Sequence, residues 1–295
     1  MQKVTAVFII CLTVVISLHG EWWDEGKFNW KKATSLDSGI LFGSMKKSSP
    51  RLMRLWVMRV DLSKNYKFAT AKKAKEYGQK VPTHPHLVIH TKRQKTVDFM
   101  TEAQKKGVNM IAAVNAPGWG PWDKTPSIYA TNLGLLISDG VVVSPKRPNN
   151  RPSFLFYKDG RVELREVKED EDLSQVAQAV TCFHLVLKDG GVINVGGNYL
   201  APRTGIGLSA DKRFMYLMVI DGRQKDFSMG CTVSEVGAIL KYLGAENGVN
   251  MDGGGSSSFV IWDKKEKKAK MLNHQPMGVI RPVGASLGII KPEKK

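Results

Sequence analysis

One short segment of the 295-residue chain combines a carboxylate, a glycine-rich turn and a run of hydroxyls. It extends from Val249 to Ser258 and reads VNMDGGGSSS, with Asp252 at the end of an apolar stretch. Glycine allows positive φ and close approach to a ligand, and a glycine-rich turn can aim N–H groups at an anion. Asp-Gly is also a common hairpin turn, but a two-residue turn does not need three glycines. The segment therefore favours a site for a phosphorylated substrate, with Asp252 as its carboxylate.

Other polar side chains fall at the ends of apolar strands, where a rigid scaffold presents chemistry to ligands. These side chains are Asn115, Arg203, Asp221 and Arg223. Each has an ordinary alternative, because it could simply begin a turn or lie at a sheet edge. Together with Asp252 they supply two carboxylates, two guanidinium groups and an amide, which indicates one site. Arginine suits phosphate oxygens, and the turn adds amide and hydroxyl donors from Gly253, Gly254, Ser256 and Ser257.

Short apolar runs separated by Asp-Gly turns predict antiparallel hairpins. Strands are expected at 52–62, 108–114, 133–137, 141–143, 153–157, 162–166, 180–187, 191–195, 204–208, 214–220, 248–251 and 259–262, with closing strands within 278–290. Helices are expected at 96–106, with Thr96 as its cap, and at 232–243. In the second helix Thr232 and Glu235 form a capping box, so Glu235 is assigned to capping. The predicted fold class is α+β: one globular domain of mostly antiparallel or mixed β-sheet with a few packed helices.

Residues 1–20 have the form of a secretory signal peptide. Lys3 provides a positive charge, residues 7–18 are apolar, and Gly20 is a small residue at a plausible cleavage point. An uncleaved anchor is the alternative. No later segment is long and apolar enough to span a bilayer, so we expect export to the periplasm or medium without a stable membrane span. Residues 21–95 are interpreted as a lead-in region that packs on the main domain, and residues 96–291 as the catalytic domain.

The composition argues against a nucleic-acid-binding protein. The chain has 44 Lys and Arg against 27 Asp and Glu, a formal net charge of +17. The excess lysines are scattered in pairs, whereas nucleic-acid-binding proteins concentrate charge in one patch or stripe. A scattered positive charge suits a solvated surface that meets anionic envelope polymers.

The cysteines and histidines leave two questions open. Cys182 and Cys231 follow the predicted signal peptide and either form a disulfide or remain buried free thiols. No Cys/His spacing resembles a structural zinc site. His84, His86 and His90 would share one face of an extended segment and could bind a transition metal. Pro85 and the flanking lysines favour an exposed connection instead.

The order of these motifs closely resembles the phosphodiester glycosidase family. The segments that carry the resemblance are 201–207, 219–223, 230–235 and 250–257, with weaker matches at 113–115, 185–190 and 281–288. The resemblance extends over residues 96–290. It departs after Asn115, where Ala116-Pro117-Gly118-Trp119 replaces the glycines and phenylalanine of the family pattern.

The resemblance implies hydrolysis of the anomeric C–O bond of a sugar-1-phosphodiester, with a sugar-phosphate glycoconjugate or envelope polymer as substrate. Asp252 would be the nucleophile or base, and Asp221 a second carboxylate that acts as acid/base or orients Arg223. Arg203 and Arg223 would hold the phosphate, and Asn115 would bind a sugar hydroxyl. No metal or cofactor is required. The alternatives are a non-catalytic binder of anionic glycans, and a metal-dependent phosphodiesterase that cuts the P–O bond.

Overall fold

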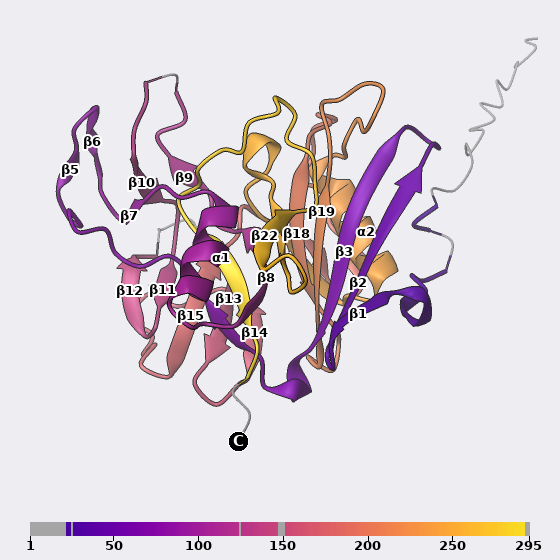
Figure 1. Ribbon diagram of the computed structural model, residues 1–295, viewed down its shortest axis with the longest axis horizontal. Coiled ribbons are helices and arrows are strands. Elements are labelled where there is room, and N and C mark those ends of the chain that lie inside the picture. The colour runs from indigo at the N-terminus through magenta and orange to yellow at the C-terminus, as the bar shows by residue number, and fades with distance from the viewer. Residues whose placement is uncertain (1–21, 25, 124, 147–150, 293–295) are drawn as a thin grey trace, which may run out of the picture.

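An eight-stranded antiparallel sheet forms the largest layer of the protein (Figure 1). The computed structural model describes residues 22–24, 26–123, 125–146 and 151–292, so the predicted signal peptide lies outside the described residues. In spatial order the strands are β1 (Thr34–Asp37), β2 (Ile40–Lys47), β3 (Met53–Asp61), β19 (Phe214–Ile220), β18 (Arg203–Leu208), β20 (Asn247–Asn250), β16 (His184–Lys188) and β17 (Gly191–Val192).

Two five-stranded antiparallel sheets pack beside this layer. The first contains β22 (Lys268–Met271), β21 (Phe259–Asp263), β8 (Met110–Asn115), β23 (Ser286–Ile290) and β4 (Lys67–Ala69). The second contains β12 (Val141–Ser144), β11 (Leu136–Ser138), β15 (Val176–Thr181), β13 (Ser153–Tyr157) and β14 (Val162–Arg165). Smaller sheets are made by β7 (Thr91–Lys92), β10 (Tyr129–Asn132) and β9 (Trp119–Gly120), and by β5 (Lys80–Val81) with β6 (His84–Val88). Single 3-10 turns lie at Trp30–Lys32, Leu62–Lys64 and Gly254–Ser256.

The three larger sheets share one apolar core. Leu217 of β19, Val114 of β8 and Phe154 of β13 belong to the same fully buried cluster. Helix α2 (Val233–Leu243) covers the outer face of the eight-stranded sheet, and helix α1 (Thr96–Lys105) covers the outer face of the sheet that contains β8. The layers therefore follow the order α2, large sheet, β8 sheet and α1 (Figure 1).

Helix α2 begins and ends as the sequence predicts. Thr232 and Glu235 form the reciprocal capping box, and Gly244 ends the helix in the left-handed region at φ 111°. The helix also lies unusually close to the sheet, because a Cβ on Gly237 would come within 2.1 Å of the Val186 carbonyl oxygen. This close packing holds α2 in place, and with it the segment that leads into Thr232.

The main outline of the sequence prediction is confirmed: the described residues form mostly antiparallel β-sheet with two α-helices. Two details are wrong. Thr96 does not cap α1, because its hydroxyl is hydrogen-bonded to the Ser286 hydroxyl at 3.0 Å and the N-cap is Lys95. The strand expected at 180–187 is two strands, β15 and β16, because the chain crosses between sheets at Cys182 and Phe183.

Residues before the predicted boundary at residue 95 contribute to both large sheets. Strand β3 pairs with β19, β4 pairs with β23, and Trp23 is buried in the cluster beneath α2. The predicted lead-in region therefore shares its core with the rest of the chain. Cys182 and Cys231 are both buried free thiols, and burial raises the pKa of each. Within the described residues, no helix is long and apolar enough to cross a bilayer.

Candidate active site

The turn that carries Asp252 joins the two facing sheets at one edge. It leaves β20 of the large sheet after Asn250 and enters β21 of the β8 sheet at Phe259. At the same edge Arg203 pairs with Ile220, directly before Asp221, and Phe259 pairs with Val114, directly before Asn115. The strand ends predicted to present polar side chains are thus brought together by strand register.

Asn115 fastens this turn to the scaffold. Its amide nitrogen donates to the Asp252 carbonyl oxygen at 2.6 Å. Its amide oxygen accepts from the Thr204 hydroxyl at 2.7 Å and from the Ser258 backbone N–H at 3.0 Å. The side chain is fully buried. These bonds give Asn115 a positioning role, because a sugar hydroxyl could reach it only by displacing one of them.

The Asp252 carboxyl is buried and only partly hydrogen-bonded. Its Oδ1 accepts from the Gly253 N–H at 3.0 Å, whereas Oδ2 has no hydrogen-bond partner among the described residues. Burial raises the pKa of Asp252 to about 6, and this effect outweighs lowering by Ser256, Gly253, Arg281 and Trp119. No carboxylate is among those influences. A carboxyl with this pKa exchanges its proton near neutral pH, which suits acid–base or nucleophilic chemistry.

Three donors of the turn and of the loop after Asn115 also lack ordinary hydrogen bonds. The Ser256 hydroxyl, the Ser257 hydroxyl and the Trp119 indole N–H are buried without a partner of normal geometry. Ser256 and Trp119 nevertheless lie near enough to lower the Asp252 pKa. Buried polar groups are rarely left unsatisfied, and those that are call for an explanation. Two such groups beside one buried carboxyl are typical of a site that binds a polar ligand.

The glycine turn does not form the expected anion-binding nest. The N–H groups of Gly253, Gly254, Ser256 and Ser257 donate to acceptors within the protein, including the Pro202 carbonyl oxygen at 2.8 Å from Gly254. Only Gly254 has positive φ, at 61°. Gly253 is needed for close packing, because a Cβ on it would lie 2.9 Å from the Pro202 carbonyl oxygen. A Cβ on Gly255 would lie 2.7 Å from the end of the Arg281 side chain, which is flexible and could move.

Each glycine of the turn lies beneath one arginine. A Cβ on Gly254 would be 3.2 Å from both terminal nitrogens of Arg223, and one on Gly253 would be 3.7 Å from Arg203. Arg281 covers Gly255 in the same way. In the described part of the chain, none of these three guanidinium groups pairs with a carboxylate. Burial lowers the pKa of Arg203, and the nearby charge of Arg223 adds to the effect.

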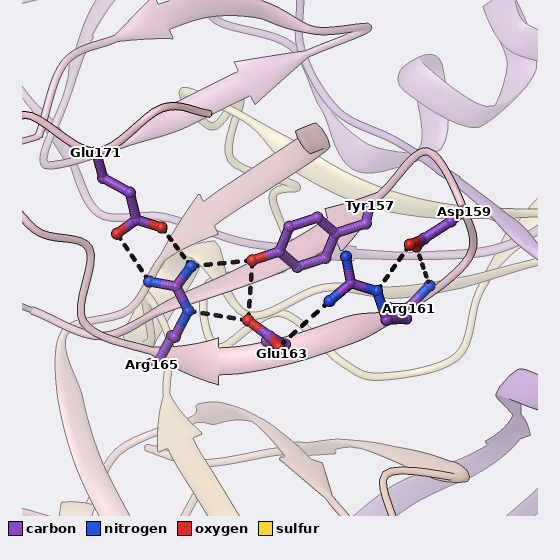
Figure 2. A network of polar contacts seen from close by, with 6 residues as sticks. All are labelled: Tyr157, Asp159, Arg161, Glu163, Arg165 and Glu171. Carbon is purple, nitrogen blue, oxygen red and sulfur yellow. Dashed lines mark hydrogen bonds and ion pairs between the residues drawn. The ribbon is translucent and has the colours of Figure 1, made fainter. Parts of the chain in front are cut away.

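Some arginines elsewhere are paired with carboxylates, as Figure 2 shows for the surface of β13 and β14, whereas others, such as Arg54 and Arg59, lie over aromatic rings. There the Arg165 Nε donates to Glu163 at 2.9 Å, its terminal nitrogens bind Glu171 and the Tyr157 hydroxyl, and Arg161 pairs with Asp159 at 2.7 Å. Like charges at the glycine turn repel one another. Their lack of carboxylate partners therefore points to an anionic ligand, for which the guanidinium group is well suited.

Asp221 has partners other than those expected. Its Oδ1 accepts from the His274 backbone N–H at 2.6 Å, its Oδ2 accepts from the Trp56 indole N–H at 3.4 Å, and neither oxygen contacts Arg223. Burial raises the pKa of Asp221. The segment that it holds also supports the turn, because the side-chain amides of Asn273 and Gln275 both donate to the Ser257 carbonyl oxygen. The contacts favour a positioning role for this fully buried carboxyl.

The sequence reasoning missed four residues near the turn: Arg93, Trp119, His184 and Arg281. Arg93 lies over the Trp119 ring at 4.3 Å, and burial, together with the nearby charge of Arg281, lowers its pKa. His184 pairs with Asn250, has a buried unpartnered Nδ1, and has its pKa lowered mainly by burial. The tryptophan-rich loop after Asn115 was a visible signal, but nothing in the sequence places Arg281 against Gly255.

The three histidines of the predicted extended segment do not converge. His84 Nε2 lies 2.7 Å from Asp123, whereas the His90 Nδ1 accepts from the Asn132 backbone N–H at 3.0 Å. His86 is exposed. Among the described residues, no three His, Cys, Asp or Glu side chains are grouped so that they could hold a metal ion.

The buried charge of Asp252 predicts a stability effect with a defined pH dependence. The folded-state pKa of about 6 lies above the ordinary value of 3.8, so the folded state loses stability as pH rises between these values. At neutral pH the cost is about 3 kcal/mol. Asp252→Asn should therefore stabilise the protein at neutral pH by a large part of this amount, and the gain should disappear below about pH 4. Denaturant unfolding at both pH values checks this; a less stable variant at neutral pH would contradict it.

Comparison with known proteins identifies the fold and the family of this chain. A search of curated proteins gave no match. Among solved structures, the catalytic domain of the zebrafish N-acetylglucosamine-1-phosphodiester alpha-N-acetylglucosaminidase, auto-inhibited by its pro-peptide, aligns with a TM-score of 0.59 and 19% identity over 89% of this chain and 87% of that one. Two further solved structures share the fold. One is a hypothetical protein from Synechocystis, with a TM-score of 0.60 and 12% identity over 86% of this chain and 62% of that one. The other is a putative exported protein from Burkholderia pseudomallei K96243, with a TM-score of 0.54 and 15% identity over 82% of this chain and 74% of that one. The phosphodiester glycosidase family matches residues 73–290, and the chain belongs to that family.

Proposed function

We propose that this protein is an exported glycosidase that hydrolyses the anomeric C–O bond of a sugar-1-phosphodiester, releasing the free sugar and a phosphomonoester. The Asp252 carboxyl carries the proposal. It is buried, its Oδ2 is unpartnered among the described residues, and its pKa is raised to about 6. Arginines without carboxylate partners surround the turn that bears it. Membership of the family supports the same reaction class.

The chemistry needs one reactive carboxylate and a stabilised leaving group. Glycoside cleavage passes through an oxocarbenium-like transition state, which a carboxylate assists as nucleophile or as base for water. Asp252 is assigned this role. The leaving group is a phosphate ester that departs as an anion, so it needs charge stabilisation more than a proton from a strong acid. This fits a site in which no carboxylate is among the main influences on Asp252.

Arg203 and Arg223 are assigned to the non-bridging phosphate oxygens, and the position of Arg281 over Gly255 adds it to this group. Ser256 and Ser257 supply hydroxyl donors, since both hydroxyls are buried and unpartnered. Asp221 and Asn115 are assigned positioning roles, because their polar atoms are used to hold the turn and the segment beside it. No metal or cofactor enters this scheme.

Product analysis tests the reaction directly. The full chain would be incubated with several sugar-1-phosphodiesters, including an N-acetylglucosamine-1-phospho compound, in water enriched in heavy oxygen. Cleavage of C–O should give a phosphomonoester without the heavy isotope in its phosphorus NMR spectrum, and Asp252→Asn should give no product. Heavy oxygen in the phosphate, or sugar-1-phosphate as product, would identify P–O cleavage. Saturable binding of the panel without turnover would support a non-catalytic glycan-binding protein.

Replacement of one free arginine should reduce catalysis without loss of the fold. Among the described residues, no acceptor binds the Arg223 guanidinium, and Arg223 already adopts φ 60°, a conformation that costs energy outside glycine. Arg223→Gln should lower kcat/KM about 10- to 100-fold, because a charge-assisted hydrogen bond contributes about 1.5–3 kcal/mol. Arg161→Gln, which removes an arginine of the surface network, is the matched control and should leave kcat/KM unchanged. Equal activity in both variants would exclude Arg223 from the phosphate site.

A further inference from the structure

The most exposed large apolar side chains border the candidate active site. Over the described residues, the five with the greatest exposed fractions are Met277 (84%), Val279 (70%), Tyr199 (61%), Ile128 (59%) and Trp122 (58%). All five lie in loops rather than in strands or helices. Exposed apolar residues scattered singly need no explanation, but several on one face indicate an interaction surface.

Met277 and Val279 lie in the loop between Gln275 and Arg281, two residues that contact the glycine turn. The loop that carries them is fixed at both ends, since the Gln275 side chain donates to the Ser257 carbonyl oxygen at 2.6 Å and Arg281 lies against Gly255. The chain between these two points therefore projects from the edge of the sheets where the site lies, at the top of Figure 1.

Tyr199 and Ile128 are connected to the same site through hydrogen bonds of their backbone carbonyl groups. The Tyr199 carbonyl oxygen accepts from Arg203 at 3.0 Å, and its ring lies 5.3 Å from the Arg223 guanidinium carbon. The Ile128 carbonyl oxygen accepts from the Arg93 backbone N–H at 2.8 Å.

Trp122 is connected through Phe183. The two ring centroids are 6.1 Å apart, and the Phe183 N–H donates to the Asn250 carbonyl oxygen at 3.0 Å, two residues before Asp252. We call these five residues, Trp122, Ile128, Tyr199, Met277 and Val279, the rim. Three of them are connected to the arginine-covered turn by contacts with Phe183, Arg93, Arg203 and Arg223. Met277 and Val279 belong to the loop that ends at Arg281.

An apolar rim around unpaired cations matches the chemistry of an anionic bilayer surface. Apolar side chains enter the boundary between head groups and acyl chains, and cations attract the negative surface. Arg223 and Arg281 are both exposed, and the chain carries a net charge of +17. A soluble substrate would need the cations but not the rim.

We propose that this rim contacts an anionic lipid bilayer and places the arginine-covered turn against phosphate head groups. The substrate assignment, unlike the membrane contact, rests on the proposed glycosidase function. With that function, the substrate is a glycosyl phosphodiester anchored in the bilayer surface. Membrane contact itself does not depend on turnover, so the two claims can fail separately.

Site-specific labelling tests the contact in the full chain. Cys182 and Cys231 are buried and unreactive, so Met277→Cys in a Cys11→Ser background offers one exposed thiol for an environment-sensitive fluorophore. Vesicles of equal parts phosphatidylcholine and phosphatidylglycerol should shift its emission to the blue, and vesicles of phosphatidylcholine alone should have less effect. The matched control is Val141→Cys, whose residue is 51% exposed on β12, at the lower left of Figure 1, and it should not respond.

A second measurement separates apolar contact from simple charge attraction. Met277→Ser with Val279→Ser should weaken binding to the anionic vesicles about 10- to 100-fold, as judged from the apolar area removed. Val141→Ser with Val142→Ser should leave it unchanged. No blue shift at position 277, an equal shift at 141, or unchanged binding of the rim variant would overturn the proposal. A shift that depends on protein concentration without vesicles would show self-association instead.

These results also distinguish the two claims. The labelled protein should respond to vesicles equally with Asp252 or with Asp252→Asn, because the carboxyl takes no part in membrane contact. A response to vesicles without turnover of any phosphodiester would refute the glycosidase function and leave the membrane contact standing. Turnover of soluble phosphodiesters without a vesicle response would refute the membrane contact and leave the glycosidase function standing.

Discussion

The burial of one carboxyl group between two sheets governs the chemistry of this site. Asp252 lies where the chain crosses from β20 of the large sheet to β21 of the β8 sheet. Its surroundings exclude water, which disfavours the charged form and raises its pKa to about 6. The protein tolerates this cost because Asn115, Thr204 and Ser258 hold the backbone of the turn in place. A strained or costly group that the fold retains is expected at a functional site.

The glycine turn and the arginines are two parts of one arrangement. The N–H groups of Gly253, Gly254, Ser256 and Ser257 are used in internal hydrogen bonds, and the turn lacks side chains where the guanidinium groups approach. Positive charge therefore comes within van der Waals distance of the backbone beside Asp252. Arg161 and Arg165, by contrast, are paired with carboxylates in a surface network.

The sequence predicted which strand ends come together better than it predicted the contacts of the residues there. Polar residues at strand ends were identifiable because apolar runs end at Asn115, Arg203, Asp221 and Asp252, and antiparallel register then brings them together. Helix α2 was predictable because a capping box is a local signal. Arg281 and the bonds of Asp221 were not, because they depend on the path of a loop. The same limit applies to residues 180–187, where an apolar run does not show that the chain changes sheets.

The central claim is that Asp252 is a reactive carboxyl whose pKa is raised by burial, and its titration is the most direct test. Carbon NMR of aspartate carboxyl groups, with Asp252→Asn to assign the signal, would follow its ionisation with pH. The account predicts a midpoint of about 6 and the same midpoint in the pH dependence of kcat/KM. A midpoint near or below the ordinary value of 3.8 would contradict it, because Asp252 would then be a solvated or ion-paired residue.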